Sequence, residues 1–532
     1  MLGLGRLMER IRRLFGNGVG RDQRPKFTSD FKLDKDTTFL TEPLDAEGFV
    51  DYETALNERL RGDIGPETNV VAWLLEALGP KPEGKRLHPD FYKWLGTEPP
   101  AEKGEYYVPL QAEFRWEIAF NGLTGFGHRL TCRQNEPWAA ADDPKFARWL
   151  RKNKGPLAQV EAAVKLAAFY LPVVGRSKDG VTGLTRSHGS NLNTAVRDLT
   201  AALAARANLR CGERAYAAAW QDVLTLYRLG RHYASGGFLI HDLVASAVEH
   251  IATCRALAVL ELALPSAAQA ERYGDDLRSL PPKPPLADIV AEGERFHGLD
   301  FLRVFRREGL RALTHSDKRR RKLPAAKREA SVGKLDFEVL LRSVNATSDR
   351  AASALRLPTH GERVAAFVSL LADFPSPQDH EFTIPDRLED VAALLEEKDA
   401  EKLRTTVTSA IEARLRCLGL VVSRYVHVLQ DRMAQEHQNL LVAVALAGHF
   451  ADTGQYPAKL DDLAPKYLAK VPDDLFSGKP LVYKPAKDGY LFYSVGVNGI
   501  DDGGKLLTDP VFNPADARGD DLGVRMPRLK LN

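Results

Sequence analysis

Apolar residues recur every three to four positions along most of the chain between Leu44 and Gly454. This spacing places them on one side of an α-helix, so it predicts a body of antiparallel helices. Glycine and proline mark the breaks between the stretches, for example at Gly236-Gly237 and in SLPPKPPL, residues 279–286. The expected helices are 52–60, 69–78, 156–168, 192–207, 213–233, 238–262, and one or two between 288 and 311.

The pattern changes near Gln435, after which the apolar residues become denser. A strongly apolar helix is expected over 440–450, and Gly454 ends it. A short helix carrying Leu460 and Leu463 is expected to follow.

Two stretches beyond this point, 480–485 and 490–495, are rich in aromatic and β-branched residues. Lys487-Asp488-Gly489 lies between them and is typical of a tight turn, so the two are expected to pair as a β-hairpin. Earlier in the chain the single strand candidate is 106–108. The sequence therefore predicts a mostly α protein, with a large antiparallel helical body and a small C-terminal α+β module, a helix plus an antiparallel sheet.

These changes of pattern divide the chain into parts. The expected divisions are a basic amphipathic helix at 1–18, a polar linker at 19–43, the two parts of the helical body at 44–278 and 287–430, the second with a basic loop at 316–334, and the C-terminal module at 431–532.

The N-terminal helix has a pattern of its own. On a helical wheel its apolar side chains fall within an arc of about 120°, and arginines occupy much of the rest. Such a helix is typical of an anchor on an anionic membrane surface; docking on the protein's own helices and a tail in water are the alternatives. The residues expected at the membrane surface are Leu4, Arg6, Leu7, Met8, Arg10, Ile11, Arg13, Leu14 and Phe15.

Composition limits the function without naming it. The chain has 532 residues and a formal net charge of +3, so any affinity for nucleic acid or membrane must come from local patches. No run of about 18 apolar residues predicts a transmembrane helix, and no signal peptide is expected. The four cysteines form no CxxC pair and are expected to be reduced core thiols of a cytoplasmic protein, at the inner face of the membrane if the N-terminal helix anchors it: Cys132, Cys211, Cys254 and Cys417.

A basic stretch lies in the second part of the body. Seven Lys or Arg and no acid occur between Lys318 and Arg328. This pattern is typical of an arm that contacts phosphates, or of a solvated loop. Aromatic residues that could stack on bases are absent nearby, so nucleic acid is disfavoured as a partner.

No common catalytic motif is present: the chain has no phosphate-binding GxxxxGK[ST], no HExxH, no GxSxG and no kinase signature. Histidines expected on one helix lie too far apart to share a metal, since His241 and His250 would face opposite sides, and His437 and His449 would be about 18 Å apart. His241 and Asp242 are expected to form a pair on a helix surface. A pair of catalytic carboxylates from distant segments would leave no sequence signal, so a hydrolase site in the helical body stays an alternative.

The C-terminal module resembles the globular domain of the major pseudopilins of type II secretion, over about a fifth of the chain. The residues that carry the resemblance are Gly454-Gln455-Tyr456-Pro457, Leu460, Leu463, Tyr467-Leu468, Pro472, Asp474, Phe476, Gly478 and Tyr493-Ser494-Val495-Gly496-Val497-Asn498-Gly499. Pseudopilins begin with a processed transmembrane helix, whereas the corresponding helix here is internal, which argues against polymerisation. The whole chain, in phrases such as NEPWAAADDPKFARWLRKNKGPL, also resembles a family of large uncharacterised bacterial helical proteins.

The resemblance implies a calcium site, because the glycine-rich loop of pseudopilins binds calcium. Carboxylate, amide and carbonyl oxygens are the ligands that calcium prefers. One set of candidate ligands follows the last aromatic strand and a second lies nearer the C-terminus; either or both could contribute, and the alternative is a loop whose side chains cap its own amides. The candidate ligands are Asn498, Asp501, Asp502, Asp520 and Asp521.

These observations favour a non-enzymatic scaffold or protein-binding protein with a pseudopilin-like module and an unidentified protein partner. A hydrolase with a site in the helical body and a nucleic-acid binder that uses the basic loop are the alternatives.

Overall fold

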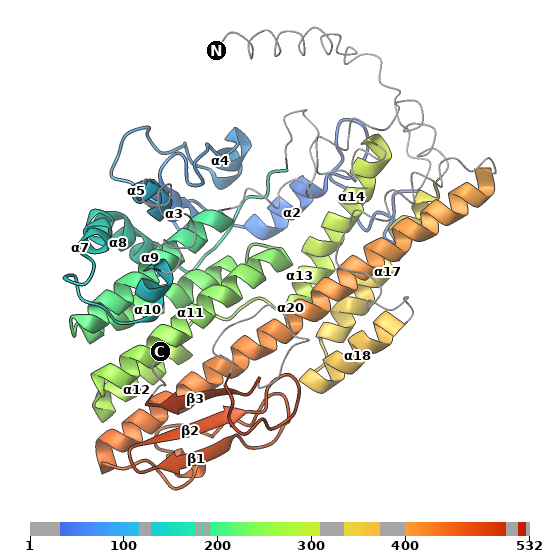
Figure 1. Cartoon of the computed structure of the whole chain (residues 1–532). Helices are drawn as coiled ribbons and strands as arrows, with labels where there is room; N and C mark the ends of the chain where they lie inside the picture. The colour runs from blue at the N-terminus through green and yellow to red at the C-terminus, as the bar shows by residue number, and fades with distance from the viewer. Residues whose placement is uncertain are drawn as a thin grey trace, which may run out of the picture.

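The computed structural model describes residues 32–115, 129–175, 184, 192–308, 335–372, 400–506 and 520–527. In these residues the protein is mostly helical and carries a small three-stranded antiparallel sheet near the C-terminus (Figure 1), which confirms the predicted fold class.

The described helices of the first part of the body include the six expected from the apolar periodicity and four that were not expected, although the one expected over 156–168 ends at Ala163. They are α2 (Tyr52–Arg61), α3 (Val70–Leu78), α4 (Pro89–Leu95), α5 (Leu110–Glu113), α7 (Pro144–Lys152), α8 (Lys154–Ala163), α9 (Asn193–Gly212), α10 (Tyr216–Tyr233), α11 (Leu239–Ala263) and α12 (Ala267–Arg278).

The remaining elements lead from the second part of the body into the module. They are α13 (Leu286–Ile289), the π-helical turn η3 (Val290–Glu294), α14 (Arg295–Glu308), α17 (Phe337–Leu355), α18 (His360–Ala372), α20 (Ala400–Thr453), the 3₁₀ turn η6 (Leu460–Leu463), β1 (Val482–Ala486), β2 (Gly489–Ser494) and β3 (Leu522–Met526).

Residues 106–108 do not form the expected strand. They are an extended connection whose polar groups are satisfied one by one: the Tyr107 amide bonds the carbonyl of Ala77 at 2.8 Å, and the Val108 amide bonds Asn153 Oδ1 at 2.8 Å. Side chains and single carbonyls take the place of a neighbouring strand here.

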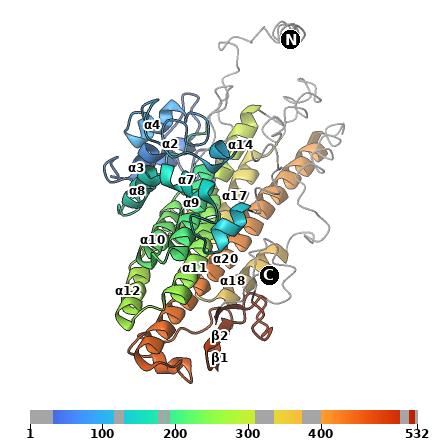
Figure 2. The same ribbon diagram turned by 60° about the vertical axis from the view of Figure 1, so that its left-hand side comes forward.

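The 54-residue helix α20 is the spine of the molecule. It packs along α11, α12, α17 and α18, and its C-terminal part contacts β3 (Figures 1 and 2). No proline interrupts this stretch, and its two glycines, Gly419 and Gly448, leave the hydrogen-bond ladder intact. The helix expected over 440–450 is therefore only the end of a much longer one, and the expected division at 430/431 lies inside it.

The largest hydrophobic core joins the helical body to the module. It contains residues of α3 and α8 to α12, the apolar end of α20, and Phe492 and Val524 of the sheet. A second core lies among α2, α14 and α17, and a third among α11, α13, α17, α18 and the middle of α20. The sheet thus shares its core with the first half of the body.

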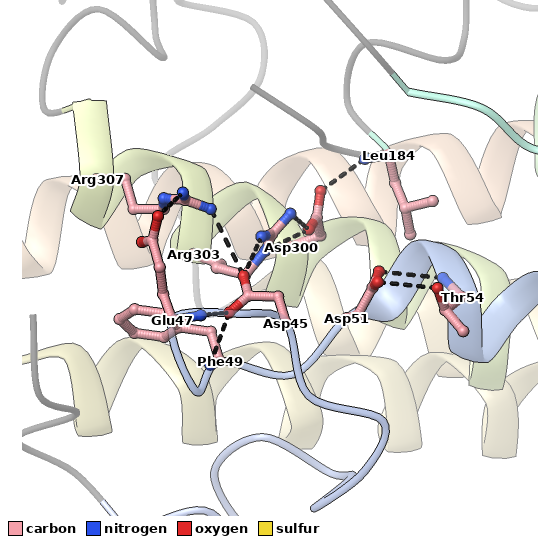
Figure 3. A network of polar contacts seen from close by, with 9 residues as sticks. All are labelled: Asp45, Glu47, Phe49, Asp51, Thr54, Leu184, Asp300, Arg303 and Arg307. Carbon is pink, nitrogen blue, oxygen red and sulfur yellow. Dashed lines mark hydrogen bonds and ion pairs between the residues drawn. The ribbon is translucent and has the colours of Figure 1, made fainter. Parts of the chain in front are cut away.

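A buried ion network fixes the second core to the chain that precedes α2. Arg303 on α14 donates to Asp300 at 2.8 Å and to Asp45 at 3.1 Å, and the amide of Leu184 donates to Asp300 at 2.6 Å (Figure 3). Asp300 is fully buried, and Arg303 forms ion pairs with both Asp300 and Asp45. Segments more than 100 residues apart are tied together by this network.

The sheet has the order β1-β2-β3, and both pairings are antiparallel. The expected hairpin is confirmed, with Ala486 paired to Gly489 across the turn. The turn is not what requires glycine at position 489. A Cβ atom there would lie 2.0 Å from the carbonyl oxygen of Met526 on β3. Strand β3 itself gave no clear sequence signal, since it is five residues long and contains Gly523 and Arg525.

Helix α11 alone among the described helices is long and apolar enough to cross a membrane, with a mean hydropathy of 1.5 in its most apolar window. Of that window, 61% is buried inside the protein, against α9, α10 and α20. Burial of this kind is usual for a core helix, so its composition is weak evidence for a membrane span.

Candidate functional site

The predicted membrane-surface residues, Leu4 to Phe15, and the basic loop at 316–334 lie outside the described residues. Of the sites predicted from the sequence, the structure therefore describes the candidate calcium ligands, which we call the acidic loop: Asn498, Asp501, Asp502, Asp520 and Asp521.

Strand pairing brings the two predicted sets of ligands together. Ser494 at the end of β2 pairs with Leu522 at the start of β3, so Asp520 and Asp521 lie beside the turn that follows β2. The Asn498 amide donates to Asp520 Oδ2 at 3.1 Å, and the Asp521 carboxylate accepts from the amides of Asp502 (3.4 Å) and Gly504 (2.7 Å). The two sets form one cluster.

The close approach depends on one glycine. Gly496 has a φ of 69°, and a Cβ atom there would lie 2.3 Å from the carbonyl oxygen of Asp520. A larger residue would be strained by the left-handed conformation and would push the Asp520 backbone away.

Asn498 and Asp501 stabilise the turn itself. Asn498 Oδ1 accepts from the Ile500 amide at 2.6 Å, and Asp501 Oδ1 accepts from the Tyr493 hydroxyl at 2.9 Å and the Gly503 amide at 2.8 Å. These are the side-chain caps of the alternative interpretation. The hydrogen bonds lower the pKa of Asp501, the Gly503 amide having the largest effect.

Asp520 and Asp521 are in a different situation. Their exposed fractions are 4% and 1%, and neither forms an ion pair among the described residues. Burial raises the pKa of both carboxyl groups, and the neighbouring carboxylates, that of Asp502 above all, raise them further. Asp520 Oδ1 is buried and has no hydrogen-bond partner in the part of the chain that the structure describes.

The residue types of this set suit a calcium ion, although the carboxylates of Asp502, Asp520 and Asp521 do not offer oxygens that all lie within 4.8 Å of one another, as the ligand atoms of His360, His427 and Asp431 do. Calcium takes about six to eight oxygens, several of them from carboxylates. Asp502, Asp520 and Asp521 supply carboxylates that repel one another, and the unpaired Oδ1 of Asp520 is an oxygen without another role among the described residues. Of the five predicted ligands, these three are the ones we expect to bind the ion, whereas Asn498 and Asp501 hold the turn.

The structure also reveals a cluster that the sequence did not indicate, between α18 and α20. We call it the histidine joint: His360, Arg363, His427 and Asp431. One ligand atom each from the two histidines and Asp431 lie within 4.8 Å of one another. No sequence motif could have found the joint, since His360 and Asp431 are 71 positions apart.

Charge decides what the joint does. Arg363 donates to both carboxylate oxygens of Asp431 at 2.8 Å, and His360 Nδ1 lies 2.8 Å from Oδ2 of the same group. These partners lower the pKa of Asp431 in spite of its burial. A divalent ion would have to compete with a guanidinium for the single acid, so we interpret the joint as an ion-paired contact between helices.

His427 is the unusual member of the joint. It is 2% exposed, stacks on Phe367, and neither ring nitrogen has a hydrogen-bond partner among the described residues. Burial lowers the pKa of His427 to about 4, so the ring is neutral at physiological pH.

His241 and Asp242 are not the surface pair expected from the sequence, because both are fully buried. Asp242 Oδ1 lies 2.8 Å from Lys283 Nζ, in the segment that follows α12. The ring of His241 packs against Tyr233, and its Nδ1 accepts a hydrogen bond from the Phe238 amide at 3.3 Å. The sequence correctly predicted that both residues lie on a helix. The face of α11 that carries them is covered by α10, α20 and the segment after α12.

Two buried amide side chains connect α20 to the module. Gln435 accepts from the Leu475 amide and donates to Asn439, and Asn439 donates to the carbonyl of Leu522 on β3, each at 2.8 Å. Both side chains are almost completely buried. The module is therefore attached through internal hydrogen bonds as well as through its core.

No protein-family model, curated protein or solved structure matches this chain.

Proposed function

We propose that this protein is a non-enzymatic, protein-binding scaffold whose pseudopilin-like module is held rigidly on the helical body and is completed by calcium. The observation that carries the proposal is α20, which runs without a break from the core of the body to the sheet. A binding surface on such a module keeps a fixed orientation, which lowers the entropic cost of engaging a partner.

The attachment supports a rigid presentation. The Gln435 side chain accepts a hydrogen bond from the module, and the Asn439 side chain donates one to it. Removal of either side chain would leave buried polar groups unpaired. A module joined through a linker would need no such contacts.

Two segments that carry the resemblance to pseudopilins lie together in the fold. Asp474 accepts from the hydroxyl of Ser494 at 2.6 Å and from the amide of Val495 at 3.2 Å, so two segments of the resemblance meet in the fold. The order of helix, short turn, hairpin, glycine-rich loop and acidic pair is also the order that the resemblance implies.

The partner surface that we favour is the tip of the acidic loop. Ile500 is 61% exposed there, next to the acids that would bind calcium. Loops positioned by a rigid scaffold often carry binding residues, and Ile500 is the large apolar side chain that this loop exposes. We place the protein in the cytoplasm, at the inner face of the membrane through residues 1–18.

Calorimetry on the full-length chain tests the calcium part. We expect heat that saturates with calcium and is lost in Asp520→Asn, while Asp473→Asn, an exposed acid of the same module, binds as the parent does. No heat at millimolar calcium in the parent would refute the calcium site.

Affinity capture tests the scaffold part. Ile500→Ser should lose a partner that Val368→Ser retains, since Val368 is comparably exposed, at 51%, but lies on α18. Identical captured proteins for both variants and the parent would contradict the proposed surface.

Fractionation of the chain with and without residues 1–18 tests the location, and equal solubility would exclude the membrane anchor.

A further inference from the structure

A second cluster lies between α11 and α20, away from the acidic loop. His250 Nε2 is 3.7 Å from Cys254 Sγ, and His250 Nδ1 is 2.8 Å from Glu436 Oε2. Cys254 lies four residues after His250, so both side chains project from the same side of α11. Glu436 comes from the facing helix, 186 positions later in the chain. We call these three residues the thiol relay.

The arrangement is linear. The thiol contacts one nitrogen of the imidazole and the carboxylate contacts the other, so the ring separates them. A metal ion needs ligands that converge on one point, and this set does not. A proton can instead pass from the thiol to a ring that the carboxylate orients, which is how a thiol is activated as a nucleophile.

Electrostatics favour the charged pair. Burial opposes ionisation of the thiol, but His250 and then Arg255 lower the pKa of Cys254 below its usual value. Burial also opposes a charge on the imidazole, yet the Cys254 thiolate and Glu436 raise the pKa of His250 to about 11. Arg432 on α20 is a further charged group at the relay, and its Nε lies 3.5 Å from Glu436 Oε1.

The relay lies close to the protein surface. Cys254 is partly exposed, and the His250 side chain has an exposed fraction of 24%. Cys211, by contrast, is buried in the main core. Cys254 thus combines access with a neighbouring base, the two properties of a reactive cysteine.

The surrounding backbone decides which electrophile the thiolate can attack. Attack on an acyl carbon needs donors aimed at the developing oxyanion. The amides around Cys254 belong to the interior of a 25-residue helix, where they bond to the carbonyls of the preceding turn. Displacement at a disulfide sulfur builds up no oxyanion and needs only a leaving thiolate that can be protonated.

We propose that Cys254, activated by His250 and held in place through Glu436, is a site of thiol–disulfide exchange with small disulfides. The Cys254 thiolate attacks one sulfur of the disulfide, a new S–S bond to Cys254 forms, and the original S–S bond breaks. The leaving thiolate takes the proton of the His250 imidazolium, which leaves a neutral ring bonded to Glu436. Addition of a second thiol reverses the step and restores the pair. This activity is independent of the scaffold role.

Site-resolved mass spectrometry of the full-length protein tests the proposal. Oxidised glutathione and iodoacetamide are the two probes, and Cys132, which is also partly exposed, is the control within the same sample. We expect Cys254 to react at least about tenfold faster than Cys132 at pH 6, where an ordinary thiol is almost fully protonated.

Variants test the role of each partner. His250→Gln should slow Cys254 about tenfold at pH 6 and much less at pH 9, where the thiol ionises without help. Glu436→Gln should shift the same pH profile in the same direction by a smaller amount, and His449→Gln, at a partly exposed histidine near the far end of α20, should leave it unchanged. Equal rates for Cys254 and Cys132 at pH 6 in the parent would overturn the proposal, and so would a flat response to both relay variants.

Discussion

Buried carboxylates in the helical body and in the C-terminal module are treated in opposite ways. In the body, Asp300 is paired with Arg303, Asp222 with Arg206, and Asp431 with Arg363 (Figure 3 shows the first). In the module, Asp520 and Asp521 are just as buried, but no lysine or arginine forms an ion pair with them among the described residues. They accept hydrogen bonds from backbone amides, other acids lie beside them, and Arg432 lowers the pKa of Asp520 without bonding to it.

The difference is the observation from which we propose a calcium site in the module. A buried charge is tolerated when an opposite charge and hydrogen bonds replace the lost water. The helical body supplies those partners from its own sequence. The acidic loop lacks them in the described residues, so a cation from solution would contribute there what arginine contributes in the body.

The largest test of this comparison is Arg303→Met, which removes a partner and keeps the side-chain volume. Asp300 would remain buried beside Asp45 without its guanidinium, so we expect unfolding to become easier by about 3–5 kcal/mol in chemical denaturation. Arg356→Met is the control: its pair with Asp288 is exposed, and its loss should cost less than about 1 kcal/mol. Similar costs for the two variants would mean that the body does not depend on its internal pairs.

His427 is an exception within the body, as is His437, because burial lowers the pKa of each ring to about 4 and keeps it neutral instead of paired. In the unfolded chain His427 binds a proton near its usual pKa, whereas in the folded chain it does so only near pH 4. The free energy of unfolding therefore decreases as the pH falls between these two values. We expect a loss of about 3 kcal/mol over that interval. His427→Leu should flatten the acid side of the stability profile, whereas His449→Leu should not; an unchanged profile in His427→Leu would show that the ring is not held neutral.

The effect of calcium on stability tests the comparison in the module. At a calcium concentration 100 times the dissociation constant, stabilisation should reach about 2.7 kcal/mol, measured as a shift of the denaturation midpoint. Asp520→Asn should abolish that shift. A shift that survives in this variant would place the ion elsewhere.

Without calcium, the same variant should be slightly more stable than the parent. The pKa values of Asp520 and Asp521 are raised, so in the folded chain these groups keep protons at pH values where the unfolded chain has released them. The free energy of unfolding therefore decreases as the pH rises from the usual aspartate pKa through the raised values. We expect Asp520→Asn to gain roughly 1 kcal/mol at neutral pH in a chelating buffer. Destabilisation in that buffer would mean that the carboxylate is already satisfied.

The smallest expected effect distinguishes Asp501, which stabilises the turn, from the proposed calcium ligands Asp502, Asp520 and Asp521. Asp501→Asn should cost roughly 0.5–1 kcal/mol through weaker bonds to the Tyr493 hydroxyl and the Gly503 amide, while calcium binding is retained. Loss of calcium binding in Asp501→Asn would assign this residue to the ion.

Local features of the structure could be predicted because they depend on neighbours in sequence. The helical period identified α2, α3 and α9 to α11 to within a few residues, and the turn residues identified the hairpin of β1 and β2. The acidic loop was also predictable as a set of residues, since a glycine-rich turn with adjacent acids has a local signature. What each acid does was not, because that depends on how β3 returns to β2.

Sequence by itself determined the class of the fold, the positions of most helices and the residues of the acidic loop, all of which follow from periodicity and turn chemistry over a few positions. Tertiary structure alone decided that α20 unites the body and the module, that His360 meets Asp431, and that Glu436 reaches His250. These contacts join residues that are 71 and 186 positions apart. Their energies come from burial and charge pairing between distant segments, and a local pattern carries no record of which segments will meet.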